Sequence, residues 1–198
     1  MNSGTARRPY RMTARAEGVA ATGERILDAT EELFWSGPVD QMSLDAVATR
    51  AGVTVQTVLR RYGSKDGLVA AAAARAAERV RRQRDTAPVG DVAGAVANLL
   101  DHYEDMGERV LRLLAEEAGN PLLAEIAQSG RELHLRWVER TFAPQLAGLR
   151  GAERARRRAQ LVAVTDVYVW KLLRRDAGLS RTQVEQAVRE LIDGLDAG

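Results

Sequence analysis

Two short helical stretches in the first third of the chain are joined through only two residues, Gly52 and Val53, and this junction constrains the fold more than any other feature. Ser43 can cap the first stretch, and the second runs from Thr54 to Tyr62. The first stretch has its apolar residues at helical spacing: Leu44, Val47, Ala48 and Ala51. Because glycine allows the backbone of a tight turn and a following valine can be buried beneath it, the junction predicts a helix-turn-helix.

Helical periodicity continues along the rest of the chain, and no segment shows the alternation of a strand. Asn120-Pro121 and the pair of Ser180 with Gln183 are typical helix starts. The expected helices cover residues 22–36, 44–51, 54–62, 65–84, 92–103, 110–118, 121–141, 153–177 and 181–195. The sequence therefore predicts an all-α fold of about nine helices, with an N-terminal three-helix head followed by a C-terminal helical body.

The boundaries of these parts are expected where the periodicity changes. Residues 1–20 lack apolar periodicity, so we expect a flexible basic arm that ends where Thr22 can cap a helix. We assign 21–66 to the head and 67–198 to the body. The helix over 65–84 would bridge both, since the next helix breakers are Thr86, Pro88 and Gly90.

The composition restricts the class of protein. With 45% apolar and 28% charged residues, the 198-residue chain is typical of a folded globular protein. It has no cysteine, which excludes disulfides, thiolate zinc sites and cysteine nucleophiles. No segment approaches the length of a membrane span, and the start lacks the apolar core of a secretory signal, so we expect a cytoplasmic protein without membrane contact.

Positive charge gathers in the head, although the net charge of the chain is only +2. Residues 46–65 include no acidic residue, and this distribution favours a polyanionic partner. The basic residues there are Arg50, Arg60, Arg61 and Lys65. The arm adds Arg7, Arg8, Arg11 and Arg15, which could enter a minor groove or stay disordered, and we favour disorder. Two further clusters are expected on exposed helix faces: Arg79, Arg81, Arg82 and Arg84, and Arg154, Arg156, Arg157 and Arg158.

Residues 22–68, TGERILDATEELFWSGPVDQMSLDAVATRAGVTVQTVLRRYGSKDGL, resemble the DNA-binding segment of the TetR family. The resemblance covers about a quarter of the chain. It lies in the order and spacing of these elements: the Ile-Leu-Asp-Ala run, Phe34-Trp35, Ser43, Ala51-Gly52-Val53, Thr57 and Gly63-Ser64-Lys65.

The resemblance implies a repressor that binds a palindromic operator in double-stranded DNA as a homodimer. Each third helix would lie in a major groove, with half-sites about 34–36 Å apart. The family also implies release by a small-molecule effector in the C-terminal domain. Dimerisation is expected through the last two helices. Tyr168, Trp170, Val188 and Leu191 are candidates for that interface, or they pack only within the subunit.

The resemblance assigns roles to individual residues of the head. Those expected to face DNA are Thr54, Val55, Gln56, Thr57 and Arg60, and those expected to hold phosphates are Ser43, Thr54, Arg61 and Lys65. Gln56 is the candidate for adenine, whose major-groove edge needs both a donor and an acceptor. Leu59 departs from the family, which usually has tyrosine there and histidine where this chain has Arg61. We expect a greater salt sensitivity from this added charge.

The body offers candidates for an effector site. His134 and Trp137 share an apolar stripe, and His102-Tyr103 end another expected helix. A polar group among apolar and aromatic neighbours is typical of a ligand pocket, but also of a hydrogen-bonded core histidine. Tyr168 completes the candidate ligand-binding set.

Two other function classes compete with a regulator. An enzyme is one, but the sequence has no Gly-rich phosphate loop after a strand, no serine elbow and no metal-ligand spacing. We therefore expect no catalytic residue, no metal and no cofactor. The other is a helical adaptor that has lost DNA binding, and the basic face over 54–65 argues against it.

Overall fold

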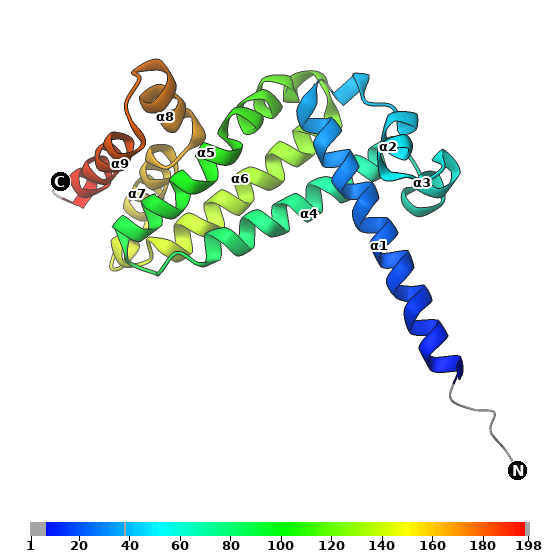
Figure 1. The fold of residues 1–198 in the computed structure, drawn as a ribbon. Helices are drawn as coiled ribbons and strands as arrows, with labels where there is room; N and C mark the ends of the chain where they lie inside the picture. Colours follow the sequence, from blue (N-terminus) through cyan, green and yellow to red (C-terminus); the bar gives the residue numbers. More distant parts are fainter. Residues whose placement is uncertain (1–6, 38, 197–198) are drawn as a thin grey trace, which may run out of the picture. The chain divides into compact units, whose positions relative to one another are not determined.

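The computed structural model describes residues 7–37 and 39–196, and regular structure in these ranges is helical throughout, without a strand (Figure 1). The α-helices are α1 (Arg7–Ser36), α2 (Leu44–Ala51), α3 (Val55–Tyr62), α4 (Lys65–Asp85), α5 (Val92–Glu116), α6 (Pro121–Thr141), α7 (Gly151–Val164), α8 (Val167–Lys171) and α9 (Arg181–Asp196). The prediction of an all-α fold with about nine helices is confirmed. None of the described helices is long and apolar enough to cross a membrane.

The chain forms two compact units, one ending at Arg75 and the other beginning at Ala76. Helix α4 is continuous across this division. The division lies further along α4 than the expected border between residues 66 and 67, and that border stays a prediction.

The first unit contains a longer first helix than the sequence indicated. Helix α1 begins at Arg7 and so includes most of the arm expected over 1–20; the flexibility of that arm stays a prediction, and residues 1–6 lie outside the described residues. Thr22 does not cap this helix, because its hydroxyl donates to the Gly18 carbonyl at 2.8 Å inside it. The segment has no apolar stripe, but it is rich in alanine, arginine and other residues that favour helix on their own.

The head is held together by a small apolar core. Helix α1 packs on α2 and α2 on α3 (Figure 1). Ile26, Val47, Val58 and Leu68 have no exposed surface. Figure 1 also shows that the first turns of α1 extend beyond the part that packs on α2.

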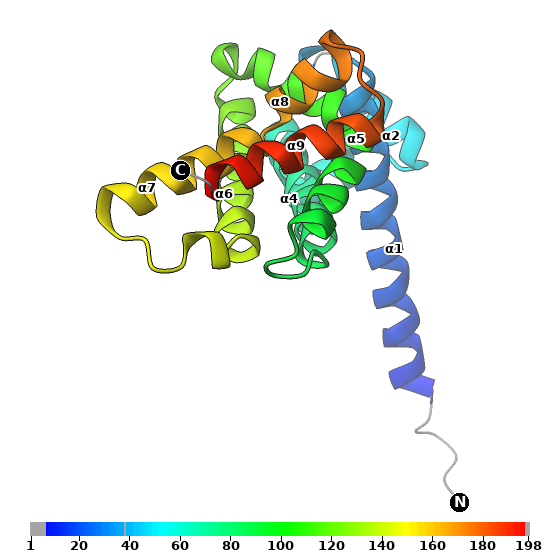
Figure 2. The same ribbon diagram turned by 90° about the vertical axis from the view of Figure 1, so that its left-hand side faces the viewer.

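The second unit is a helical bundle around α5. Helix α5 packs against α6, α8 and α9, and α7 packs against α6 and α9. Figure 2 shows α9 crossing α5. Large side chains from these helices fill the core: Leu99, Leu100, Phe142, Leu161, Trp170 and Ile192.

Two expectations for this unit are wrong: two expected helices are one helix, and one expected helix is divided into two. The helices expected over 92–103 and 110–118 are one helix, α5, with Gly107 buried inside it. The helix expected over 153–177 is divided, because Asp166 caps α8 by accepting from the Tyr168 N–H at 2.9 Å. Helix α8 then continues as a π-helical turn, Leu172–Asp176.

Candidate nucleic-acid interface and buried polar cluster

The junction between α2 and α3 has the backbone of a tight turn. Gly52 has φ +65°, in the left-handed region that favours glycine, and its N–H donates to the Ala48 and Thr49 carbonyls. The Val53 N–H also donates to the Ala48 carbonyl, at 2.9 Å. These bonds end α2 and turn the chain directly into α3. The predicted helix-turn-helix junction is confirmed.

Helix α3 is fixed at its start and along its inner face. The Thr54 hydroxyl accepts from the Thr57 N–H at 3.2 Å and lies 2.9 Å from the Thr57 hydroxyl, while Val58 is fully buried. The outer face is therefore presented in one orientation. Its side chains are exposed at Thr54, Gln56, Arg60 and Arg61, and half-buried at Val55, Thr57 and Leu59.

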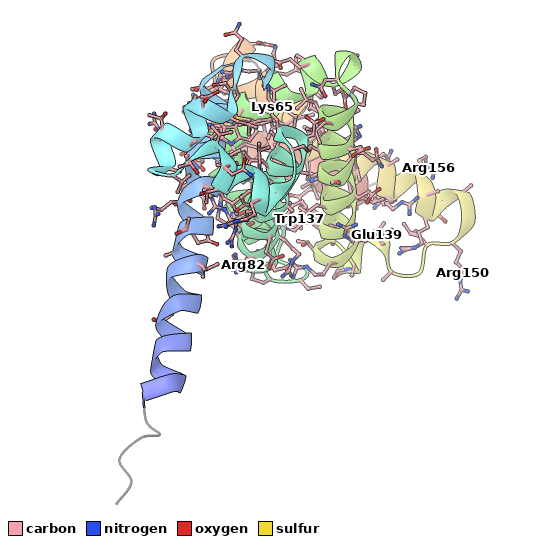
Figure 3. The ribbon with its side chains drawn as sticks, turned by 90° about the vertical axis from the view of Figure 1, so that its right-hand side faces the viewer. Lys65, Arg82, Trp137, Glu139, Arg150 and Arg156 are labelled. Atoms are coloured by element: carbon pink, nitrogen blue, oxygen red, sulfur yellow. The ribbon has the colours of Figure 1, made fainter. Side chains whose placement is uncertain are left out.

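The remaining two predicted phosphate contacts lie at helix starts. Ser43 is exposed and caps α2, accepting from the Ala46 N–H at 3.1 Å. Lys65 is the first residue of α4 and is half-buried (Figure 3). A helix N-terminus carries a partial positive charge, so both positions suit an anionic oxygen.

Arg61 has a contact that the sequence did not indicate. Its Nη1 donates to the Val19 carbonyl of α1 at 3.2 Å. Gly23 makes room for it, because a Cβ at that position would lie 2.3 Å from Nη2 of Arg61. The neighbouring Tyr62 hydroxyl donates to the Gly23 carbonyl at 3.3 Å. The end of α3 is thus fastened to α1.

An ion-pair network fastens α4 to α1 within the same unit. The Arg75 guanidinium contacts Glu24, Asp28 and Glu31 at 2.7–2.8 Å. Burial by itself would lower the pKa of Arg75, but hydrogen bonds to the three carboxylates outweigh it and raise that pKa. The network anchors α4 about ten residues after its start.

A polar cluster lies buried in the second unit around Arg84, which is 3% exposed. Its guanidinium carbon is 5.4 Å from the centre of the Tyr103 ring and 4.9 Å from that of Trp137. Its Nη1 donates to Nδ1 of His134 at 3.4 Å. We call Arg84, His102, Tyr103, His134 and Trp137 the Arg84 cluster.

The hydrogen bonds of His134 define its protonation. The Thr165 hydroxyl donates to the Leu161 carbonyl at 2.6 Å, so the Nε2–H of His134 donates to Thr165 Oγ1 at 3.1 Å. Nδ1 is then free to accept from Arg84. Burial, with the charge of Arg84, lowers the pKa of His134 to about 4 and that of His102 to about 3. Both imidazoles are therefore neutral near pH 7.

The structure brings four of the five candidate ligand-binding residues together, in the Arg84 cluster. The fifth, Tyr168, does not join them: it is 52% exposed on α8. The expected exposure of Arg84 is wrong. This residue continues the inward stripe of α4, which consists of Val69, Ala72, Ala76 and Val80. Helical spacing alone could have identified it.

The four candidates for the dimer interface fall into a buried pair and an exposed pair. Trp170 and Val188 are buried within the unit, whereas Tyr168 and Leu191 are exposed, together with Leu172 of the π-helical turn. No group of His, Asp and Glu among the described residues could hold a metal ion.

Comparisons with known proteins match the head by sequence. Residues 26–72 match the family "Bacterial regulatory proteins, tetR family". The HTH-type transcriptional regulator AlkX of Mycobacterium tuberculosis is 29% identical over 119 residues, which are 60% of this chain. The chain spans about half of that relative, 51% of its length.

Solved structures match most of the chain in fold. A transcriptional regulator from Rhodococcus sp. Rha1 has a TM-score of 0.65 at 22% identity and covers 87% of this chain and 95% of its own. Salmonella enterica GusR has a TM-score of 0.65 at 21% identity, covering 89% and 96%. Bacillus subtilis FadR, solved in complex with stearoyl-CoA, has a TM-score of 0.59 at 14% identity, covering 85% and 96%. Residues 26–72 are thus similar to the tetR family of bacterial regulatory proteins, the curated relative is a transcriptional regulator, and the solved structures show that the rest of the chain shares their fold.

Proposed function

We propose that this protein is a DNA-binding transcriptional repressor that binds a palindromic operator as a homodimer and is released by a small molecule bound in its C-terminal unit. The observation that carries the proposal is the outer face of α3. It is polar and basic, and capping at Thr54 and burial of Val58 fix its orientation. A helix held in this way fits a major groove.

Roles at the interface follow from side-chain chemistry. The exposed Gln56 amide reads an adenine, and Arg60 projects from the same face one helical turn later. Ser43, Thr54, Arg61 and Lys65 hold phosphates. One Arg61 nitrogen is engaged with α1, and the guanidinium has further donors for a phosphate. Leu59, with Val55, offers an apolar contact such as a thymine methyl.

Exposed apolar side chains support the homodimer. Tyr168 is 52% exposed, Leu172 57% and Leu191 46%. Helix α9 packs beside the π-helical turn that carries Leu172, so these side chains belong to adjacent elements. A second copy of the chain would cover them and remove apolar surface from water.

The release by a small molecule is supported by the Arg84 cluster, where polar groups converge among aromatic rings. FadR, a protein of the same fold, was solved with stearoyl-CoA bound. A helical body of this fold can thus hold an organic ligand.

The DNA-binding proposal is tested by selecting duplexes from a random-sequence library with the purified protein. We expect a palindromic consensus. Gln56→Ala should reduce discrimination at one base pair per half-site by about 1–3 kcal/mol. Arg61→Ala with Lys65→Ala should weaken binding to every sequence and lower the log-log salt slope by about 0.9 for each phosphate that is no longer neutralised.

Arg156→Ala is the matched control, because it removes an exposed arginine on α7, a helix of the second unit (Figure 3). Its binding should equal that of the wild type. Repression is checked by in vitro transcription from a promoter that carries the selected duplex. No enriched sequence, or equal binding by the double variant, would refute the proposal.

A further inference from the structure

The charge of Arg84 is buried without an acidic partner. The residue is 3% exposed, and its guanidinium contacts neutral side chains of the described residues: His134, Tyr103 and Trp137. The positively charged Arg140 contacts Arg84 at its backbone carbonyl. Burial of a guanidinium in this way is unfavourable enough to lower its pKa. Arginines that are buried in folded proteins are ordinarily paired with an anion.

Two hydrogen-bond donors in the same place also lack an acceptor. Nε of Arg84 and Nε1 of Trp137 are buried, and neither has a hydrogen-bond partner among the described residues. The guanidinium lies 4.9 Å from the centre of the Trp137 ring. An unpaired buried donor is costly, and a ligand group with two acceptor oxygens would give each of these donors a partner.

The surroundings define what that acceptor is. Both histidines of the cluster are neutral, so Arg84 contributes one positive charge to be balanced. Trp137 also meets Phe142 edge to face, with ring centres 5.5 Å apart, and belongs to the apolar core. A group with one negative charge, two acceptor oxygens and an apolar body fits these neighbours.

We propose that the Arg84 cluster binds an organic monocarboxylate, whose carboxylate accepts from Arg84 Nε and Trp137 Nε1 while its apolar body packs against the aromatic rings. This inference deepens the proposed release mechanism and rests on it for its role as an effector site. Both donors are shielded from solvent in the described arrangement, so the ligand enters when the surrounding side chains move. Association is then slower than for an open site.

The test uses the full chain without DNA and four probes in isothermal titration calorimetry. Benzoate and octanoate carry the carboxylate, and benzamide and octanamide are their neutral counterparts. At least one acid should bind saturably, and its amide should bind at least about tenfold more weakly, since it lacks the charge that pairs with Arg84. Inorganic phosphate, which has no apolar body, should not bind measurably.

Variants assign the binding to Arg84. Arg84→Met should reduce acid binding at least about tenfold, and it keeps a side chain of similar length for packing. Arg82→Met is the matched control on the same helix, because Arg82 is 65% exposed (Figure 3), and its acid binding should equal that of the wild type. Trp137→Phe keeps an aromatic ring but removes the unpaired N–H, and should weaken binding several-fold. Unfolding curves show whether each variant is folded.

The proposal is overturned if neither acid binds saturably, if acid and amide bind equally, or if Arg84→Met and Trp137→Phe both bind acid as the wild type does. Failure of the repressor proposal is a separate result. A protein that binds the acid through Arg84 but selects no duplex retains the carboxylate site and loses the DNA-binding function. A protein whose duplex binding is intact and whose acid binding is absent shows the reverse.

Discussion

At the scale of single residues, burial controls the protonation of the two histidines. His102 and His134 are the only histidines in the sequence, and both lie in the Arg84 cluster. Burial and the neighbouring guanidinium favour the neutral imidazole in the folded protein, with pKa values of about 3 and about 4. The unfolded chain has the ordinary value of about 6.5. It therefore binds more protons than the folded protein at mildly acidic pH.

Stability should consequently fall as the pH drops. Since the unfolded state takes up protons below about pH 6.5 and the folded state does so only near pH 4 and below, the free energy of unfolding should decrease by about 4 kcal/mol between pH 7 and pH 5. Urea denaturation at both pH values measures this. The double variant His102→Gln, His134→Gln should show a much smaller decrease. An equal decrease in the wild type and in the double variant would show that the two histidines do not cause the loss of stability.

Residue roles were predictable where they depend on local spacing. Ser43 and Thr54 are caps because each hydroxyl reaches an N–H three residues ahead. The burial of Arg84 also follows from local spacing, because this residue lies one helical turn after Val80 on the inward stripe of α4. The contact of Arg61 with Val19 was not predictable, because these residues are 42 positions apart and the contact requires α1 to extend before Thr22.

At the scale of elements, Gly107 shows how packing can overrule a local signal. The helices expected over 92–103 and 110–118 left Gly107 outside a helix, yet α5 runs through it. The reason is the Trp170 ring, since a Cβ on Gly107 would lie 2.5 Å from its Cζ3. Glycine is present here for close packing between α5 and α8, and its poor helix propensity is outweighed.

Gly107→Ala should therefore destabilise the protein even though alanine favours helix. Overpacking against a buried tryptophan costs about 1–3 kcal/mol, more than the gain in propensity of about 1 kcal/mol. Gly130→Ala in α6 is the matched control: Gly130 is exposed and helical with nothing near its Cβ position, so the change should stabilise by up to about 1 kcal/mol. Thermal unfolding compares the two, and a stabilised Gly107→Ala would contradict this account.

Two other helix boundaries were predicted wrongly, and each has its own physical reason. The start of α1 depends on residue propensity, and its first turns have no apolar stripe that periodicity could detect. The break between α7 and α8 depends on the Asp166 cap. That cap lies between two apolar runs whose spacing resembles one helix. A cap is a single residue, so it gives a weaker sequence signal than an apolar stripe of several residues.

At the scale of the whole molecule, the exposed apolar residues of α8, the π-helical turn and α9 should determine the oligomeric state. Leu172→Glu with Leu191→Glu places two charges on the proposed dimer surface, and the mass from light scattering should fall to that of a monomer, because burying unpaired charge is unfavourable. Val89→Glu is the control, since Val89 is 56% exposed outside these elements, and it should remain a dimer. A wild-type monomer, or a double variant that stays dimeric, would refute this interface.

Fold class and the reading head were predictable because they depend on periodicity and on a few capping and turn residues. The site in the body was predictable only in part, since His134 and Trp137 are neighbours on one helix whereas Arg84 and Thr165 reach them from distant segments. Long-range contacts of this kind depend on the packing of the whole unit.

The ion-pair network around Arg75 also affects how the head meets a polyanion. Three carboxylates surround this one guanidinium, so negative charge is in excess where α1 is joined to α4. Residues 46–65, in contrast, carry only positive charges. If the head binds a duplex as proposed, a phosphate that approaches within about 8 Å, the Debye length at physiological salt, is attracted by residues 46–65 and repelled by the three carboxylates. Collisions that begin in an unproductive orientation are thereby turned toward α3, and a larger share of encounters leads to binding.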